Sequence, residues 1–408
     1  MTDKPRIAVI GGGAAGMMAA GTATHSGADV TLFEHTDRLG WKLSITGKGR
    51  CNVTNNCSVT DFLDNVTKNP RFLYSALSAF SPADTMELFS ELGVELKTER
   101  GMRVYPASDK AADIVAAMKK YSSDAKVIYT KIKSIDKRNG VFVVLADREY
   151  EFDRVIMATG GKSYPRTGSD GSGFRLARRL GHSITELIAS LVPLESNSEL
   201  CRDMQGLSLK NVGIKITDKN GRMLYSDFGE MMFSHFGVTG PVILSASAHL
   251  RNTDISSLTL SIDLKPALDE KALDKRLLSD FKTESNKDFI NSLGGLLPSK
   301  MILPFVRYTG IDSRKKVNSI TKEERRRILE ALKSFSIPLS GMRPIEEAVV
   351  TSGGISTSEV SPKTLESKIV EGLFFAGEML DVDAYTGGFN LQIAFSTGFL
   401  AGKCAAEN

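Results

Sequence analysis

Residues 7–17 read IAVIGGGAAGM, and this stretch decides the fold of the amino-terminal part of the chain. Its first four residues, 7–10, are apolar and mostly β-branched, as expected of a buried strand, and they run directly into glycines. A helix is predicted to follow and to end just before Gly27, which suits a left-handed stop. A second apolar strand over residues 30–33 leads to Glu34. This order predicts a β-α-β unit of about 30 residues, which opens a parallel sheet.

The glycines of this stretch have the spacing of the dinucleotide-binding fingerprint G-x-G-x-x-G, at Gly11, Gly13 and Gly16. The bare pattern is weak in a chain with 36 glycines, but here a strand precedes it, a helix follows it and Glu34 ends the next strand. The first glycine permits a sharp turn, the second lets the backbone approach a pyrophosphate, and the third lets the helix pack on the strand. Glu34 is suited to a ribose diol. A tight turn without a ligand is the competing interpretation.

The composition is that of a soluble globular protein. The 408 residues predict two or three compact units, and 41% hydrophobic with 25% charged residues argue against collagen-like, disordered and polytopic membrane proteins. The 52 basic and 48 acidic side chains leave a net charge of only +4, so we expect neither a nucleic-acid partner nor a membrane partner. The four cysteines form no C-x-x-C pair and the five histidines no metal-binding spacing. We therefore expect reduced thiols, a cytoplasmic location and no metal.

The character of the sequence changes twice after the first module. Short alternating segments such as 213–217 predict an antiparallel sheet. A charged helical region comes next, in which Thr321 and Glu324 form the capping box of a helix predicted to end near Phe335. From Ile345 onward the glycine-rich character returns. We therefore predict an α/β fold with a Rossmann-like domain in two parts, 1–192 and 344–408, interrupted by an antiparallel β-rich domain over 193–343 that includes a helical subdomain at about 265–340.

Five blocks of sequence resemble a known family. They are IAVIGGGAAGM (7–17), ITGKGRCNVTN (45–55), ATGGKSYPRTGSDGSG (158–173), FSHFGVTGP (233–241) and GLFFAGEMLDVDAYTGGFNLQ (372–392). In content and order they resemble the YhiN/BaiN-like flavoproteins, the aminoacetone-oxidase-type FAD-binding family of the glutathione-reductase-like superfamily. The resemblance implies one bound FAD, held by a domain that an antiparallel β-rich domain and a small helical subdomain interrupt. No second G-x-G-x-x-G module is present to hold NAD(P)H separately.

Three segments outside the glycine loop are expected to hold FAD. Lys48 and Arg50 offer positive charge to a pyrophosphate or to the flavin edge, with a solvated basic loop as the alternative. Cys51 is interpreted as a packed small side chain rather than a reactive thiol. Glu378 resembles the acidic residue that binds the ribityl chain in the superfamily's second flavin motif, with a surface ion pair as the alternative. A helix predicted to start near Asn390 is expected to stabilise negative charge at the N1–C2=O edge of the reduced flavin. The complete set of predicted cofactor-binding residues is Gly11, Gly13, Ala14, Ala15, Gly16, Glu34, Lys42, Gly47, Lys48, Gly49, Arg50, Cys51, Asn52, Thr159, Gly160, Gly161, Gly377, Glu378, Asp381, Gly387, Gly388, Phe389, Asn390 and Leu391.

Two side chains are candidates for catalysis on the substrate side. His235 lies in a polar, glycine-flanked loop of the inserted segment, and histidine suits proton transfer near neutrality; a structural histidine is an equal alternative. Tyr164 is interpreted either as a phenol that faces the flavin or as a turn aromatic. The basic runs 314–316 and 325–327 favour a solvated helix face over a site for an acidic partner.

The resemblance implies an FAD-dependent oxidoreductase that transfers a hydride between a small organic substrate and flavin N5. In a reductase version, NAD(P)H is a transient electron donor and a carbon–carbon double bond is reduced. In an oxidase version, an amine such as aminoacetone is oxidised and O2 accepts the electrons. The residues favour neither version. A flavin-containing RNA-binding or RNA-modifying protein is the alternative from another class, and the low net charge argues against it.

Overall fold

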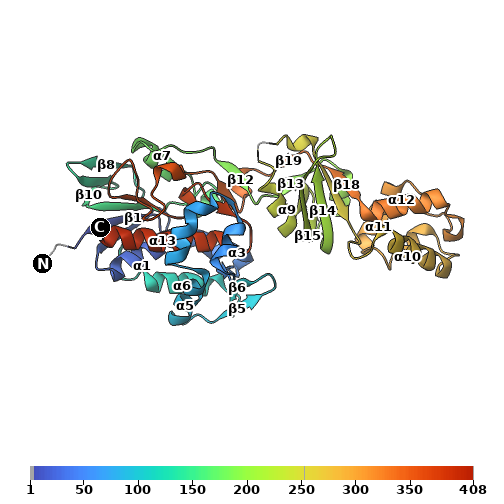
Figure 1. Cartoon of the computed structure of the whole chain (residues 1–408), viewed down its shortest axis with the longest axis horizontal. Coiled ribbons are helices and arrows are strands. Elements are labelled where there is room, and N and C mark those ends of the chain that lie inside the picture. The colour runs from blue at the N-terminus through green and yellow to red at the C-terminus, as the bar shows by residue number, and fades with distance from the viewer. Residues whose placement is uncertain (1–3, 252, 408) are drawn as a thin grey trace. The chain divides into compact units, whose positions relative to one another are not determined.

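The computed structural model describes residues 4–251 and 253–407. The chain forms two compact units, Met1–Ser190 with Ile345–Asn408, and Leu191–Pro344. The sequence places the corresponding boundaries at 192/193 and 343/344. Both units are drawn in Figure 1, and each is described below by itself. The predicted fold class is confirmed, with an α/β core in the first unit and an antiparallel sheet with helices in the second.

The first unit is built on a parallel sheet of five strands. Each strand pairs with its neighbours in parallel, so all the carboxyl ends lie at one edge of the sheet, where ligands of such folds bind. The predicted first and second strands and the helix between them are confirmed. In sheet order the strands are β21 (Leu373–Phe375), β11 (Arg154–Met157), β1 (Arg6–Ile10), β2 (Asp29–Glu34) and β7 (Lys126–Tyr129).

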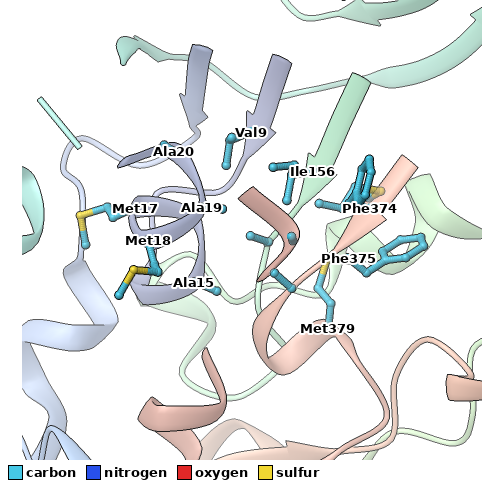
Figure 2. Packing of buried hydrophobic residues seen from close by; sticks show 14 of the residues in the cluster. Val9, Ala15, Met17, Met18, Ala19, Ala20, Ile156, Phe374, Phe375 and Met379 are labelled. Atoms are coloured by element: carbon cyan, nitrogen blue, oxygen red, sulfur yellow. The ribbon is translucent and has the colours of Figure 1, made fainter. Parts of the chain in front are cut away.

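Two helices from opposite ends of the chain pack against each other on this sheet. They are α1 (Ala14–His25) and α13 (Phe389–Glu407), and both are rich in small residues. A side chain at Gly402 would lie 2.5 Å from the Ala19 carbonyl oxygen, so the missing Cβ allows the backbones to approach closely. Figure 2 shows this core, where Ala19 of α1 lies near Val9 of the central strand. The predicted start of α13 near Asn390 is confirmed, and the helix extends to Glu407.

Smaller sheets and helices complete the first unit. Ser81 and Asp84 form a capping box at the start of α5, as favoured by the Ser-Pro sequence there. The strands are β8 (Ser134–Arg138), β9 (Val141–Leu145) and β10 (Glu149–Phe152) in one sheet, β3 (Thr54–Asn55), β6 (Arg103–Pro106) and β5 (Leu96–Glu99) in a second, and the pairs β4 (Val66–Lys68) with β22 (Asp383–Ala384) and β12 (Ile188–Ser190) with β20 (Val350–Ser352). The helices are α2 (Trp41–Ile45), α3 (Val59–Asp64), α4 (Tyr74–Ala79), α5 (Pro82–Glu91), α6 (Ala111–Tyr121) and α7 (Ser172–Arg179).

The second unit has its own sheet and its own core. All pairings in its seven-stranded sheet are antiparallel, as predicted. In order the strands are β18 (Phe335–Pro338), β17 (Thr259–Asp263), β14 (Ser208–Thr217), β15 (Met223–Ser234), β16 (Gly237–Thr239), β13 (Leu194–Glu195) and β19 (Gly341–Met342). The helices are α8 (Glu199–Asp203), α9 (Pro241–Ser247), α10 (Glu270–Thr283), α11 (Ser299–Thr309) and α12 (Lys322–Lys333).

One helix in this unit ends slightly before the predicted position. The capping box of Thr321 and Glu324 is confirmed, but α12 ends at Lys333 rather than near Phe335. Phe335 instead begins β18 and pairs with Ile262, where its ring is fully buried. Pairing with a strand far away in the sequence therefore prevails over the local helical pattern. Among the residues described, we find no helix with the length and apolar character needed to cross a membrane.

Candidate functional site

The glycine-rich turn after β1 contains glycines that the fold requires and one glycine that borders open space. Gly11 has φ +107° and faces the Ala158 carbonyl, and a Cβ at Gly16 would lie 1.7 Å from the Gly11 oxygen. The fold itself therefore requires both. A Cβ at Gly13 meets no atom within 4 Å, so the space beside this residue is open. No side chain among those described caps α1 at Gly13, and the first N–H groups of a helix, here from Ala14 and Ala15 onward, have no partner within the helix.

Glu34 ends β2 at the same edge of the sheet and is buried. One carboxylate oxygen accepts from the Gly12 N–H at 2.8 Å, and the other accepts from the Thr36 N–H at 2.7 Å. Each oxygen can accept a further hydrogen bond. Glu34 is therefore fixed beside the open space at Gly13 with capacity for two hydroxyl donors. An open backbone cradle, an uncapped helix start and this carboxylate fit the pyrophosphate and ribose of a dinucleotide.

The loop after α2 is held in an unusual conformation. Gly47, Lys48 and Cys51 have φ values of +57°, +58° and +60°, in the left-handed region that non-glycine residues rarely adopt. Such strain is typical of ligand-binding loops that the surrounding structure holds in place. Cys51 is fully buried, and burial raises the pKa of its thiol to about 12. This supports the interpretation of Cys51 as a packed side chain.

The structure does not support the predicted role of Arg50. Its guanidinium donates to Glu99 and Asp109, and it lies 4.2 Å from the centre of the Tyr105 ring. The hydrogen bonds from Arg50 lower the pKa of Glu99. Because two carboxylates already neutralise this guanidinium, it has little charge to offer a pyrophosphate. Lys48 is exposed and has no ion-pair partner among the residues described.

Lys42 and Glu378, both predicted to bind the cofactor, are brought together across 336 positions of sequence. The Lys42 ammonium donates to Glu378 at 2.8 Å and to the Ser163 hydroxyl at 2.6 Å. Glu378 also accepts from the Thr351 N–H at 2.8 Å and from Ser163. Burial alone would raise the pKa of Glu378, but the Lys42 charge and these hydrogen bonds hold it below its usual value. A Cβ at Gly161 would lie 2.7 Å from the Glu378 oxygen, so this glycine packs directly on the ion pair.

The start of α13 is anchored on the first half of the chain. A Cβ at Gly388 would lie 2.3 Å from the Thr54 carbonyl, and its φ is +98°. In the orientation that satisfies its neighbours, the Asn52 amide oxygen accepts from the Gly388 N–H at 3.0 Å. Asn390 closes the turn by donating to the Ala384 carbonyl at 2.7 Å. The predicted residues Gly387, Phe389 and Leu391 belong to the same turn and first helical residues.

Sequence reasoning missed the residue that fixes this helix start. Gln392 is fully buried, and its amide oxygen accepts from the hydroxyls of Thr54 at 2.6 Å and Thr85 at 2.8 Å. A second missed group is Asp383, a buried carboxylate that accepts from Thr67, Ser190 and Ser352 at 2.9–3.0 Å. Both are polar residues in apolar surroundings, a signal that becomes meaningful only once the burial is known.

The remaining predicted cofactor residues divide into two groups. Thr159 follows β11 and donates to the Met379 sulfur at 3.0 Å, and Gly160 has φ +74°, so these residues line the strand end as expected. Gly377 has φ +74° at the turn that leads to Glu378. Asp381, by contrast, is buried against Lys68, with 2.6 Å between the carboxylate oxygen and the ammonium. Its position suggests a structural ion pair.

The two candidate catalytic residues lie in different units. Tyr164 is 39% exposed and has φ +52°, at the start of a short turn of 3-10 helix over Pro165–Thr167. His235 is exposed between β15 and β16 of the second unit, where its ring contacts Phe236 at 5.1 Å between centroids. Within the described parts of the chain, neither side chain makes a hydrogen bond. Their predicted roles in proton transfer stay predictions.

Comparisons with known proteins agree with this geometry. The family model described as the HI0933-like protein Rossmann domain matches residues 5–404. A 3-dehydro-bile acid delta(4,6)-reductase from Clostridium scindens is 32% identical over 411 residues, which cover 98% of this chain and 99% of the relative. A ribosomal RNA dihydrouridine synthase from Haemophilus influenzae is 29% identical, over 98% of each chain. A 3-ketosteroid-delta4-(5alpha)-dehydrogenase from Rhodococcus jostii shares the fold, with a TM-score of 0.50 at 15% identity, over 100% of this chain and 98% of that one.

Proposed function

The chain belongs to the HI0933-like family of FAD-dependent Rossmann oxidoreductases, and from this we propose that it reduces a carbon–carbon double bond next to a carbonyl group. The observation that carries the proposal is the match to a bile-acid reductase over nearly the whole of both chains. The names of this relative and of the dihydrouridine synthase both describe the saturation of a carbon–carbon double bond.

The reaction balances with NAD(P)H as the electron donor. NAD(P)H gives a hydride and becomes NAD(P)+, and the substrate gains that hydride on one carbon and a proton on the other. FAD, when bound, would supply the hydride-transfer chemistry that links the two half-reactions. That proton would come from water or from a side chain, for which Tyr164 and His235 are our candidates.

The residues of the first unit would hold and tune this cofactor. The open backbone at Gly13 and the carboxylate of Glu34 would bind the pyrophosphate and ribose. The Lys42–Glu378 pair lies at the end of β21, where the ribityl chain is expected. The N-terminal end of α13 would stabilise negative charge on the N1–C2=O edge by roughly 1 kcal/mol, because its first N–H groups have no helical partner.

Anaerobic spectroscopy tests the proposal. The purified holoprotein is mixed separately with NADH, NADPH and aminoacetone, and the absorbance of the oxidised flavin is followed. We expect bleaching by a nicotinamide and recovery when a 3-keto-4,6-diene steroid or a uridine-containing RNA is added. Bleaching by aminoacetone followed by recovery in air, with no response to either nicotinamide, would establish an amine oxidase instead.

A second substrate class follows from the relative that acts on ribosomal RNA. Its similarity also covers 98% of both chains, so the same double-bond chemistry on a uracil ring is equally open to this chain. Nucleoside mass spectrometry of an in vitro transcribed ribosomal RNA, after incubation with NADPH and the holoprotein, tests this directly. Dihydrouridine in the RNA favours this class, and saturation of the steroid alone favours the small-molecule class.

A further inference from the structure

A basic groove lies on the first unit, and its lining residues differ from those predicted to hold FAD. It has a volume of about 270 Å³ and is formed by α7 and by the segment that follows β7. Its apolar lining residues, Ile132 and Leu176, are both buried. Its cationic lining residues are Lys131, Lys133, Arg175 and Arg179. None of the predicted cofactor residues contributes to it.

The positive charge of this groove is largely uncompensated. Lys131 lies 3.3 Å from Asp170, but in the described parts of the chain Lys133, Arg175 and Arg179 have no acidic partner within ion-pair distance. Arg179 donates only to the Lys133 carbonyl, at 3.4 Å. Arg178, next to the groove, is also exposed and without an ion pair among the described residues.

The basic runs of the second unit make a useful contrast. Lys315 pairs with Glu324 at 2.7 Å, Arg325 with Asp274 at 2.8 Å, and Arg326 with Glu330 at 2.8 Å. These basic residues form ion pairs on the helix surface, which agrees with the solvated helix face favoured by the sequence. The net charge of the whole chain is therefore only +4, although positive charge is exposed locally at the groove. In the second unit, most of the basic side chains named here are paired with carboxylates.

The spacing of the arginines concentrates this charge on one face. Arg175, Arg178 and Arg179 are three and four positions apart on α7, so they project from neighbouring positions of the helix surface. The opposite face, with Phe174 and Ala177, is buried in the core. Arg178 and Arg179 lie in the last turn of α7, where the helix dipole stabilises positive charge. Arg175 lies before this last turn and lines the groove together with Arg179, so exposed positive charge is concentrated at the groove.

We propose that this groove binds the sugar–phosphate backbone of single-stranded RNA. One phosphate is satisfied by two cations, whereas four cations along a helix and an adjacent segment match a run of successive phosphates. The inference rests on the proposed function, because it names RNA as the substrate class, but binding is measured without turnover, so the two can fail separately.

Fluorescence anisotropy of a labelled single-stranded RNA, titrated with holoprotein at several salt concentrations, tests the groove. The double variant Arg175→Gln/Arg179→Gln should bind at least roughly tenfold more weakly at physiological salt. Its log Kd against log salt should have a slope smaller by about 1.4, since each phosphate contact on a single strand contributes about 0.7. The matched control is Arg314→Gln/Arg326→Gln in the second unit, which removes the same charge and should bind as the wild type.

Three results would overturn the inference. They are no RNA binding by the wild type at physiological salt, an equal loss in both double variants, and weakened NADPH binding with unchanged RNA binding in the groove variant. The last result would assign the groove to the phosphate of a nucleotide. Because both arginines are exposed, FAD content and thermal midpoint should not change. Bleaching of the flavin by NADPH, measured on the same variant, reports on the proposed reduction independently.

Discussion

Gly13 and Gly16 belong to one fingerprint, yet the structure gives them different tasks. Gly13 has an ordinary extended backbone, φ −81° and ψ −167°, and open space on its Cβ side. Gly13→Val should therefore leave the apoprotein folded but weaken FAD binding by roughly tenfold or more, about 1.4 kcal/mol, because the side chain would occupy the place of the pyrophosphate. Equilibrium dialysis of the refolded apoprotein with FAD measures this loss.

Gly16→Val is the matched comparison, because a Cβ there would lie 1.7 Å from the Gly11 oxygen. This variant should lower the thermal midpoint of the apoprotein, since the backbone of the turn must move. A Gly13→Val protein that unfolds as easily as Gly16→Val would show that Gly13 serves the fold. A yellow, fully loaded Gly13→Val protein would place the pyrophosphate elsewhere.

We expect Cys51 to lower the free energy of unfolding as the pH rises into the alkaline range. Its thiol has a pKa near 9 in an unfolded chain, and burial raises it to about 12 in the fold. Between these values the folded state keeps a proton that the unfolded state loses, so stability is present below pH 9 and falls as the pH rises. In urea unfolding, Cys51→Ala should flatten this decline by up to about 1.4 kcal/mol per pH unit.

The half-buried Cys404 provides the control for this measurement. The pKa of its thiol is raised mainly by burial and also by nearby Glu407, but the side chain is only partly shielded. Cys404→Ala should therefore change the slope less than Cys51→Ala. Equal slopes in the wild type and in Cys51→Ala would mean that the Cys51 thiol ionises in the folded protein, and it would then be a candidate nucleophile.

At the scale of elements, the contact of α1 with α13 ties the two ends of the chain together. A Cβ at Gly402 would lie 2.5 Å from the Ala19 oxygen and 3.0 Å from its Cα. Gly402→Val should force the helices apart and lower the free energy of unfolding by about 1–3 kcal/mol, the usual cost of overpacking. Lys403→Val, on the exposed side of the same helix, controls for the β-branched side chain. Circular dichroism of thermal unfolding distinguishes the two, and a loss confined to Lys403→Val would refute close packing at Gly402.

What the sequence predicts at this scale depends on how local the cause is. The capping box of Thr321 and Glu324 is set by residues close together in the sequence, and it is confirmed. The end of α12 and the partners of Arg50 depend on strands distant in the sequence, which no local pattern encodes. The Lys42–Glu378 pair shows an intermediate case. Both residues are predicted from the sequence to bind the cofactor. Their ion pair, however, becomes visible only in the structure, where β21 lies in the same sheet as the first strands.

For the whole molecule, the two units differ in what each needs in order to fold. The second unit is one uninterrupted segment, Leu191–Pro344, with its own buried core that includes Phe233, Phe289 and Phe305. The first unit needs both ends of the chain, because β21 is an edge strand of its sheet and α13 covers α1. Within the first unit, Ser190 lies opposite Val350 in the pair β12 and β20, so the cut ends of the chain are neighbours there.

This arrangement predicts that the second unit can be removed without loss of FAD. A chain in which a short glycine–serine linker joins Ser190 to Ile345 should purify yellow, because β12 and β20 already bring those ends together and every predicted cofactor residue is retained. The fragment Leu191–Pro344 should unfold cooperatively and be colourless, and residues 4–190 alone should not bind FAD, because they lack β21 and α13. Flavin absorbance after gel filtration and thermal unfolding measure these outcomes. A folded but colourless linked chain would show that residues of the second unit hold the cofactor, whereas a linked chain that retains FAD but loses turnover would assign the second unit to the substrate.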